Sequence, residues 1–106
     1  MAVTILKLSR KSSRNKENFF IWGQVLKSAF SVPANIVEGY HSHKGKNYIS
    51  KLEIARGESG ETEYWLFVLL EIADLDENTY NTLSGECKEV ILMLSSMIKK
   101  LGNSVK

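Results

Sequence analysis

Apolar and small residues recur along most of this chain at alternating steps of three and four residues. The first series is Phe19, Trp22, Leu26, Ala29, Pro33, Ile36 and Tyr40. The second series is Tyr48, Leu52, Ala55, Ser59, Thr62, Leu66, Leu69 and Ala73. The third series is Leu83, Cys87, Val90, Leu94, Met97 and Leu101. Such spacing is typical of helices packed at a shallow angle, and the sequence shows little of the two-residue alternation of strands. It therefore predicts an all-α fold.

The boundaries of the series predict three long helices, over about residues 17–41, 47–74 and 77–101. Residues 1–16 form either a short basic first helix, over residues 2–9, or a disordered arm. We expect Gly45 to separate the first two long helices and Gly102 to end the last one. Short connections imply antiparallel neighbours. A chain of 106 residues accommodates one such domain.

Composition excludes several classes of protein. The single cysteine, Cys87, excludes an internal disulfide framework and a cysteine-based zinc finger, and it fits a reducing, cytoplasmic setting. The longest strongly apolar runs, residues 64–70 and 90–94, are far shorter than the roughly 20 residues of a membrane span. The start of the chain, MAVTILKLSRK, has no apolar stretch of signal-peptide length. We expect a cytoplasmic protein with no membrane partner.

Charge is divided unevenly along the chain. Residues 1–51 carry nine Lys and Arg against two acids, a net charge of +7, and residues 52–106 carry five against ten, a net charge of −5. This division indicates a basic surface for RNA or DNA, complementary faces that meet in self-assembly, or solvated faces with no partner. The candidate nucleic-acid contacts are Lys7, Arg10, Lys11, Arg14, Lys16, Lys44, Lys46 and Lys51.

Pro33 interrupts the first helical series. Proline removes a backbone hydrogen bond and pushes on the carbonyl of Ala29, so we expect a kink or break there. Gly57 and Gly60 in the second series each cost about 1 kcal/mol of helix propensity relative to alanine. We interpret these two glycines as the place where the neighbouring helix approaches closely at the kink.

Two blocks of the sequence resemble the motifs of a known family. Residues 32–40, VPANIVEGY, are similar to the signature S-[IV]-P-x-N-I-x-E-G-[FY] of a small bacterial four-helix-bundle family. That family includes proteins encoded in intervening sequences of large-subunit ribosomal RNA genes, and relatives of the accessory protein of diversity-generating retroelements. Residues 48–61 resemble its second block, F-x-x-x-L-x-I-A-x-G-S-x-x-E, with Glu58 in place of serine. Gln24 also matches, and the resemblance covers about residues 18–101.

The resemblance implies an antiparallel up-down four-helix bundle that assembles as a homopentamer and has a proposed nucleic-acid-binding role and no established enzymatic activity. The first helix of this chain looks truncated by comparison. The motif positions that we single out are Pro33, Asn35, Glu38, Gly39, Gly57 and Glu61. The retroelement relatives suggest an alternative, a protein–protein adaptor for a partner such as a reverse transcriptase.

Asn35, Glu38 and Glu61 are the most unusual polar choices in the helical series. They form either a ligand-binding cluster or, as we favour, a hydrogen-bond network that fixes helix register. Glu38 and His41 form one Glu-x-x-His pair, whereas a di-iron bundle needs two such pairs and further carboxylates. With no phosphate-binding glycine loop either, the sequence predicts no catalytic residue, metal or cofactor.

Residues 64–70 are apolar almost all round the helix. A helix on the surface of a monomer shows one apolar stripe rather than a collar. The collar indicates either contact with another subunit or a helix covered on several sides within the bundle.

Overall fold

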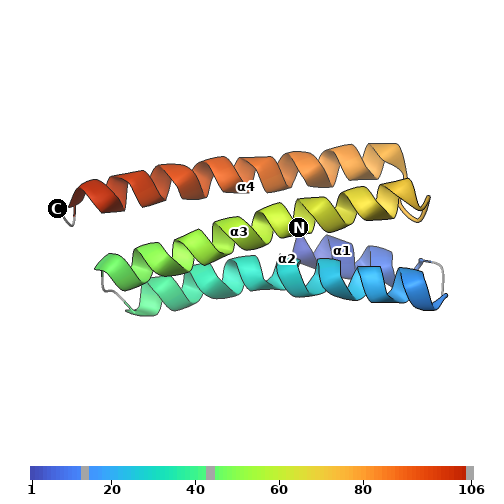
Figure 1. The fold of residues 1–106 in the computed structure, drawn as a ribbon, viewed down its shortest axis with the longest axis horizontal. Coiled ribbons are helices and arrows are strands. Elements are labelled where there is room, and N and C mark those ends of the chain that lie inside the picture. The colour runs from blue at the N-terminus through green and yellow to red at the C-terminus, as the bar shows by residue number, and fades with distance from the viewer. Residues whose placement is uncertain (13–14, 43–44, 105–106) are drawn as a thin grey trace.

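The computed structural model describes residues 1–12, 15–42 and 45–104, and this part of the chain forms four helices (Figure 1). They are α1 (Ala2–Ser9), α2 (Lys16–Ser42), α3 (Gly45–Glu71) and α4 (Glu77–Ser104). Successive helices run in opposite directions along a rod of 50 × 21 × 17 Å (Figure 1). No strand occurs in the described ranges. The predicted all-α, up-down bundle with a short first helix is confirmed.

The helix that contains Pro33 is continuous, as the predicted single helix over residues 17–41 requires, so of the kink or break expected at the proline the break does not occur. Buried residues on both sides of the proline, Val25 and Ala29 before it and Gly39 after it, pack against the rest of the bundle and keep the two segments in one helix. Gly102 also differs from its prediction, because it lies inside α4 rather than at its end. Gly45 is the first residue of α3 rather than part of a separate connection.

The C-terminus of α3 is closed by a reversal of the backbone rather than by a glycine. Ala73 has a φ of 61°, in the left-handed region. The amide of Asp74 donates to the carbonyl of Leu69 at 2.9 Å, and the amide of Ala73 donates to that of Leu70 at 3.0 Å. This pair of bonds defines a Schellman motif, and it ends α3 at Glu71, three residues before the predicted boundary.

Hydrogen bonds hold the connection between α3 and α4 to α2 on one side and to the first turn of α4 on the other. The indole Nε1 of Trp22 in α2 donates to Asp74 Oδ2 at 2.7 Å. The backbone amide of Thr79 donates to Asp76 Oδ1 at 2.6 Å, so Asp76 caps the start of α4. The backbone and side chain of Thr79 lower the pKa of Asp76 below its ordinary value of 3.8. These contacts fix the angle at which α4 turns back along α3.

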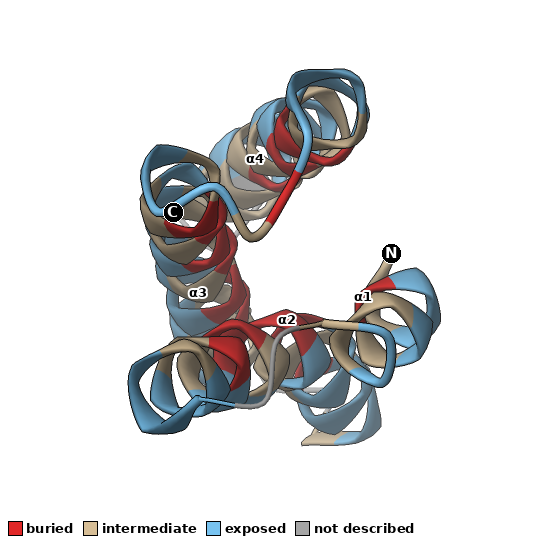
Figure 2. Cartoon of the chain, turned by 90° about the vertical axis from the view of Figure 1, so that its right-hand side faces the viewer, coloured by how far each residue is buried: buried red, intermediate tan, exposed pale blue. Residues whose placement is uncertain are grey.

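The bundle is open along one edge. Helix α1 packs on α2, α2 on α3, and α3 on α4, whereas within the described helices no Cα atom of α4 lies within 8 Å of α1 or α2. Viewed end on, the four helices form a U with α1 and α4 at its two tips (Figure 2). The 27 residues of α2 extend about 40 Å and the 8 residues of α1 only about 12 Å.

The length of α1 divides the bundle into two halves. The closed half is the part that α1 covers, and its core contains Ile5, Trp22, Val25, Ala29, Leu66, Leu69, Leu75, Leu83 and Cys87. The open half is the remainder, where the buried core consists of Val32, Leu52, Ala55 and Leu94. Partly buried side chains complete the open half, among them Ile36, Val90, Met97 and Leu101.

The three predicted helical series are buried to different extents. In the second series the residues from Leu52 to Leu69 are all buried, as predicted. In the first series Trp22 and Ala29 are buried, whereas Phe19, Pro33 and Tyr40 are exposed. Pro33 and Tyr40 lie on the same side of α2 as Leu26 but beyond the extent of α1, whereas Phe19 is exposed next to Ser9 and Ser12 at the end of α1.

No helix within the described ranges combines the length and the apolar content that a membrane span requires.

Candidate functional site

The predicted nucleic-acid contacts lie at the two opposite ends of the rod. The first group surrounds the α1–α2 connection: Lys7, Arg10, Lys11 and Lys16, all exposed, while Arg14 lies outside the described residues. Acidic residues of the α3–α4 connection lie at the same end, and Lys11 lines a shallow depression together with Asp74 and Asp76. This end therefore has mixed charge.

The second group lies at the α2–α3 end, where the last turns of α4 add further lysines. Lys46 is exposed, and Lys44 lies outside the described residues. Lys51 pairs with Glu38, with 3.2 Å between Nζ and Oε2. The C-terminal turns of α4 lie at the same end of the rod (Figure 1), and Lys99 and Lys100 in these turns are exposed. We call Lys46, Lys51, Lys99 and Lys100, together with Glu38 as the acid paired with Lys51, the basic end. Sequence reasoning missed Lys99 and Lys100 as candidate contacts because they lie about 50 residues from Lys46 along the chain and sit within its acidic part.

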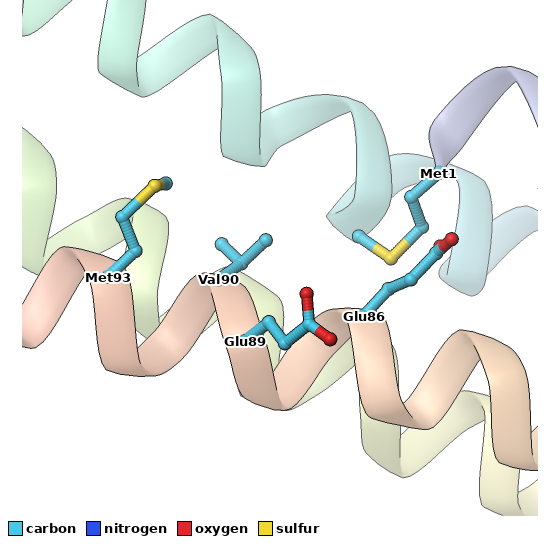
Figure 3. A pocket seen from close by; sticks show the side chains of 5 residues that line it. All are labelled: Met1, Glu86, Glu89, Val90 and Met93. Carbon is cyan, nitrogen blue, oxygen red and sulfur yellow. The ribbon is translucent and has the colours of Figure 1, made fainter.

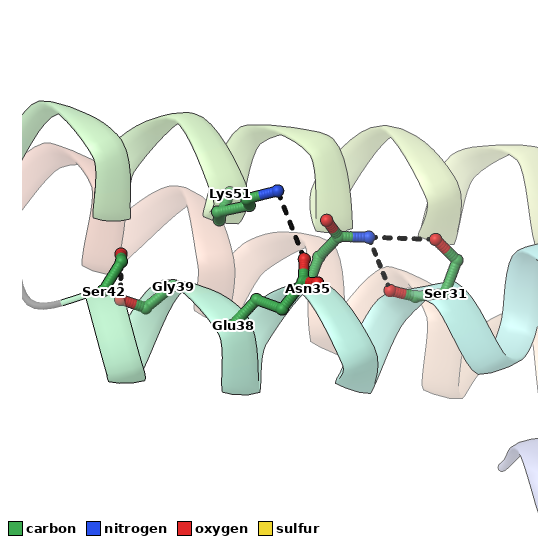
Figure 4. A network of polar contacts seen from close by, with 6 residues as sticks. All are labelled: Ser31, Asn35, Glu38, Gly39, Ser42 and Lys51. Carbon is green, nitrogen blue, oxygen red and sulfur yellow. Dashed lines mark hydrogen bonds and ion pairs between the residues drawn. The ribbon is translucent and has the colours of Figure 1, made fainter.

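Of the polar side chains in the first motif, Asn35 makes contacts within α2 and Glu38 makes a contact with α3 (Figure 4). Asn35 Nδ2 donates to the carbonyl oxygen of Ser31 at 2.8 Å and to its Oγ at 2.9 Å. Glu38 reaches across to Lys51 on α3 and is otherwise exposed to solvent. Asn35 therefore fastens one turn of its own helix, close to Pro33, and Glu38 links α2 to α3.

Close approach of α2 and α3 occurs at Gly39, not at Gly57. A Cβ atom on Gly39 would lie 2.9 Å from Cδ1 of Tyr48 and 3.0 Å from Cβ of Lys51. A Cβ atom on Gly57 or Gly60 would have no neighbour within 4 Å. The predicted role of Gly57 and Gly60 in helix approach is therefore wrong. The small residues of α3 that are fully buried are Ala55 and Ser59 instead.

Glu61 does not join Asn35 and Glu38. Its Oε1 accepts a hydrogen bond from Nε1 of Trp65, one turn further along α3, at 3.3 Å. The expectation of one polar network among the three residues is therefore wrong, because each side chain has a separate partner. Among the described residues, no three His, Cys, Asp or Glu side chains come together in an arrangement that holds a metal ion.

Short hydroxyl side chains link the three long helices inside the bundle. Thr62 Oγ1 on α3 donates to Ser28 Oγ on α2 at 2.8 Å, and Ser59 Oγ donates to the carbonyl of Cys87 on α4 at 3.2 Å. Burial, followed by the nearby Glu63 carboxylate, raises the pKa of the Cys87 thiol to about 11. Cys87 is therefore a protonated core residue at neutral pH, and these hydroxyls hold the helices in register.

An aromatic face covers the outer side of α2 and α3 in the closed half. We define it as Phe20, Tyr64, Trp65 and Phe67, of which all but the half-buried Trp65 are exposed. The rings of Phe20 and Trp65 meet edge to face at a centroid distance of 6.4 Å. A groove of about 450 Å³ runs beside them, lined by Lys16, Glu17, Phe20, Ile21 and Trp65. The apolar collar predicted for residues 64–70 is thus covered by the bundle on one side only.

A second hollow lies between Met1, at the start of α1, and α4 (Figure 3). It has a volume of about 430 Å³ and is lined by Met1, Glu86, Glu89, Val90 and Met93. Met1 lies across the gap from α4, and its sulfur is 3.4 Å from the Cys87 thiol. Oε2 of Glu86 is buried and has no hydrogen-bond partner. An unpaired carboxylate oxygen at the edge of an apolar hollow costs stability, so it calls for an explanation.

These features define a small helical-bundle protein whose exposed surface carries a basic end, an aromatic face and an open edge. The chain belongs to the 23S rRNA-intervening sequence protein family, whose model matches residues 1–96. Among solved structures, the chain is similar to a protein of unknown function from the S23 ribosomal protein family of Bacteroides thetaiotaomicron. The two are 33% identical, with a TM-score of 0.85 over 92% of this chain and 91% of that one. Comparison with curated proteins gives no match.

Proposed function

We propose that this protein is a non-enzymatic helical bundle that forms a homo-oligomer, a pentamer as the family resemblance implies, and binds RNA or DNA through its basic end. The observation that carries the nucleic-acid part is that Lys46 and Lys51 of α3 lie at the same end of the rod as Lys99 and Lys100 of α4. Neither the family description nor that of the similar structure names a reaction.

Two properties of the basic end support binding to a phosphate backbone. Each phosphate that a lysine neutralises releases counterions, which makes binding favourable at low salt. Tyr40, 61% exposed, lies at the same end and offers a ring on which a base can stack. Tyr48 does not offer its ring in this way, since it packs against Gly39. In a pentamer the basic end is repeated five times, so weak contacts add as avidity.

The aromatic face supports self-association. Exposed apolar side chains grouped on one face of a small protein are typical of a protein–protein interface. A single copy of the chain leaves most of this face uncovered. The same observation favours the second candidate function, an adaptor that holds a partner protein such as a reverse transcriptase. A reverse-transcriptase gene beside the gene for this chain would favour the adaptor.

The basic end is tested by charge reversal at matched positions. Fluorescence anisotropy measures binding of labelled single-stranded RNA, double-stranded RNA and double-stranded DNA at low and moderate salt. We expect Lys46→Glu combined with Lys99→Glu to weaken binding about tenfold or more and to reduce the salt dependence. Lys7→Glu combined with Lys11→Glu, at the mixed-charge end, serves as the control and changes binding less. No binding by the unmodified protein even at low salt would contradict the nucleic-acid proposal.

Assembly is tested by light scattering on the purified protein. We expect a mass several times that of the 12.0 kDa chain. Replacement of the exposed Phe20 and Tyr64 by lysine should reduce that mass while circular dichroism stays helical. A monomeric mass for the unmodified protein would contradict the oligomer.

A further inference from the structure

Helix α4 carries an exposed leucine between lysines. Leu92 is 70% exposed, more than any other large apolar side chain in the described part of the chain. Among the described helices α4 packs on α3 alone, so most of its circumference is uncovered (Figure 2). Steps of four and three from Leu92 place Lys88, Ser96 and Lys99 on the same side of α4, and all of them are exposed. We call Lys88, Leu92, Ser96 and Lys99 the α4 ridge, and its charged residues are both lysines.

The aromatic face, in contrast, is bordered mainly by acids. Glu17 lines the groove beside the rings, together with Lys16. Glu61 accepts a hydrogen bond from the indole of Trp65. Glu71 lies one turn beyond the last ring of the face, and all three glutamates are exposed. Two aromatic faces in contact bring these like charges together, which is unfavourable, whereas the lysines of the α4 ridge have the opposite sign.

Symmetry also separates the two kinds of contact. A surface that binds its own copy makes an isologous contact, and one such contact joins only two chains. Assembly of more than two chains about one axis requires a heterologous contact, in which two different surfaces of the chain meet. The aromatic face and the α4 ridge are two such surfaces. They lie on different helices, one contains a groove of about 450 Å³ and the other an exposed leucine.

We propose that the aromatic face of one copy binds the α4 ridge of a second copy, with Leu92 in the groove beside Phe20 and Trp65 and Lys88 facing the acids that border the rings. The proposal rests on the homo-oligomer proposed above and names the surface that the aromatic face binds. Each copy carries both surfaces, so the same contact repeats in one direction from chain to chain and closes into a ring.

Two neighbouring positions on α4 test the contact. Leu92→Glu places an acid on the ridge, whereas Met93→Glu places the same acid on the side of α4 that lines the hollow near Met1, where Met93 is 51% exposed. Light scattering measures the mass of each variant, and circular dichroism checks that both stay helical. We expect Leu92→Glu to reduce the mass several-fold, toward that of the 12.0 kDa chain, and Met93→Glu to leave it unchanged. Equal effects of the two variants would overturn the proposal.

Cross-linking identifies which surfaces meet. Glu17→Cys places a thiol at the rim of the groove, and Ser96→Cys places one on the ridge, one turn from Leu92. A short bismaleimide is added to the two variants expressed together, and the unmodified protein is the blank because Cys87 is buried. We expect covalent dimers that contain one chain of each variant. Dimers formed by Glu17→Cys alone would show that the aromatic face binds itself, and the proposal would be wrong.

Failure of this contact and failure of the proposed oligomer give different results. A monomeric mass for the unmodified protein contradicts the oligomer and the contact together. An oligomer whose mass falls when Phe20 and Tyr64 are replaced by lysine, but not in Leu92→Glu, retains the oligomer and overturns the α4 ridge as the partner of the aromatic face.

Discussion

The closed and open halves of this bundle are built from the same three long helices, yet they bury their apolar residues differently. In the closed half, α1 places Ile5 in the core, and Trp22 on α2 is 4% exposed. In the open half, Val37 and Tyr40 on the same helix are more than half exposed. The three-and-four spacing of α2 is continuous through both halves. A regular apolar pattern therefore shows which face of a helix is apolar, but not whether another helix covers that face.

The two halves also rely on different contacts to hold their helices together. The closed half is fastened at its end by the Schellman motif after α3, the Trp22–Asp74 hydrogen bond and the Asp76 cap. In the open half, α2 and α3 approach closely at Gly39, Lys51 pairs with Glu38, and Arg56 on α3 donates to Ser95 on α4. The closed half has the larger buried core, and the open half has more exposed apolar side chains on α2.

Truncation of apolar side chains should give the largest difference in stability between variants of the two halves. Leu69→Ala removes a fully buried side chain in the closed half and should lower the free energy of unfolding by about 2–5 kcal/mol. Met97→Ala, partly buried in the open half, should cost about 1 kcal/mol or less, because solvent already reaches it. Urea denaturation measures both. Equal losses would mean that another helix covers the open half in solution.

The contrast between glycines gives the next largest effect. Gly39→Ala forces its methyl against Tyr48 and should destabilise the protein by about 1–3 kcal/mol. Gly57→Ala adds a methyl in open space within the same bundle and should stabilise it by about 0.5–1 kcal/mol. Thermal unfolding of the two variants provides the comparison. A loss of stability in Gly57→Ala would show that α3 has a close neighbour there in the assembled protein.

Glu86 tests whether the open edge has a stability cost. Replacing its unpartnered carboxylate by an apolar side chain of similar size, Glu86→Met, should stabilise the free protein by about 1 kcal/mol. Glu89→Met, at an exposed neighbouring position of the same hollow, should change stability by less than about 0.5 kcal/mol. Chemical denaturation of both measures the difference. A destabilised Glu86→Met would mean that the carboxylate already has a partner in solution.

Asp76 gives the smallest effect and probes the closed end through pH. Its pKa is lowered in the folded protein, so its charged form stabilises the fold above its ordinary pKa of 3.8, and this contribution is lost as the pH falls below that value. Asp76→Asn keeps a capping oxygen but does not titrate in this range. We expect unmodified protein to lose stability relative to Asp76→Asn between pH 4 and 2.5. A constant difference across this range would contradict the role of the charge in the cap.

Much of the fold follows from sequence because helical spacing depends on local geometry. The second series, from Leu52 to Leu69, predicts the buried stripe of α3 correctly, since α3 lies between α2 and α4 and has neighbours along its whole length. The first series fails at Pro33 and Tyr40, because their burial depends on how far the separate helix α1 extends. The collar at residues 64–70 is partly exposed, at Tyr64 and Phe67, so the bundle does not cover it on all sides, and its contact with another subunit stays a prediction.

The candidate site is less predictable because it depends on contacts between distant segments. Gly39 lies in the recognised motif, but its close neighbour Tyr48 becomes apparent only when α2 and α3 are aligned. In the sequence, Gly57 and Gly60 are equally good candidates for close helix approach, although both face open space. Lys99 and Lys100 lie in the acidic part of the sequence and reach the basic end only because α4 runs back along the whole length of the rod.

The lone thiol is a natural reporter of transient opening. Cys87 is fully buried beneath Met1, and its high pKa leaves almost none of the reactive thiolate at neutral pH. A maleimide or disulfide reagent therefore modifies this protein only during the moments when the first helix lifts away from the fourth. The rate of that labelling, followed with no engineered probe, measures how often the open edge opens far enough to expose Cys87.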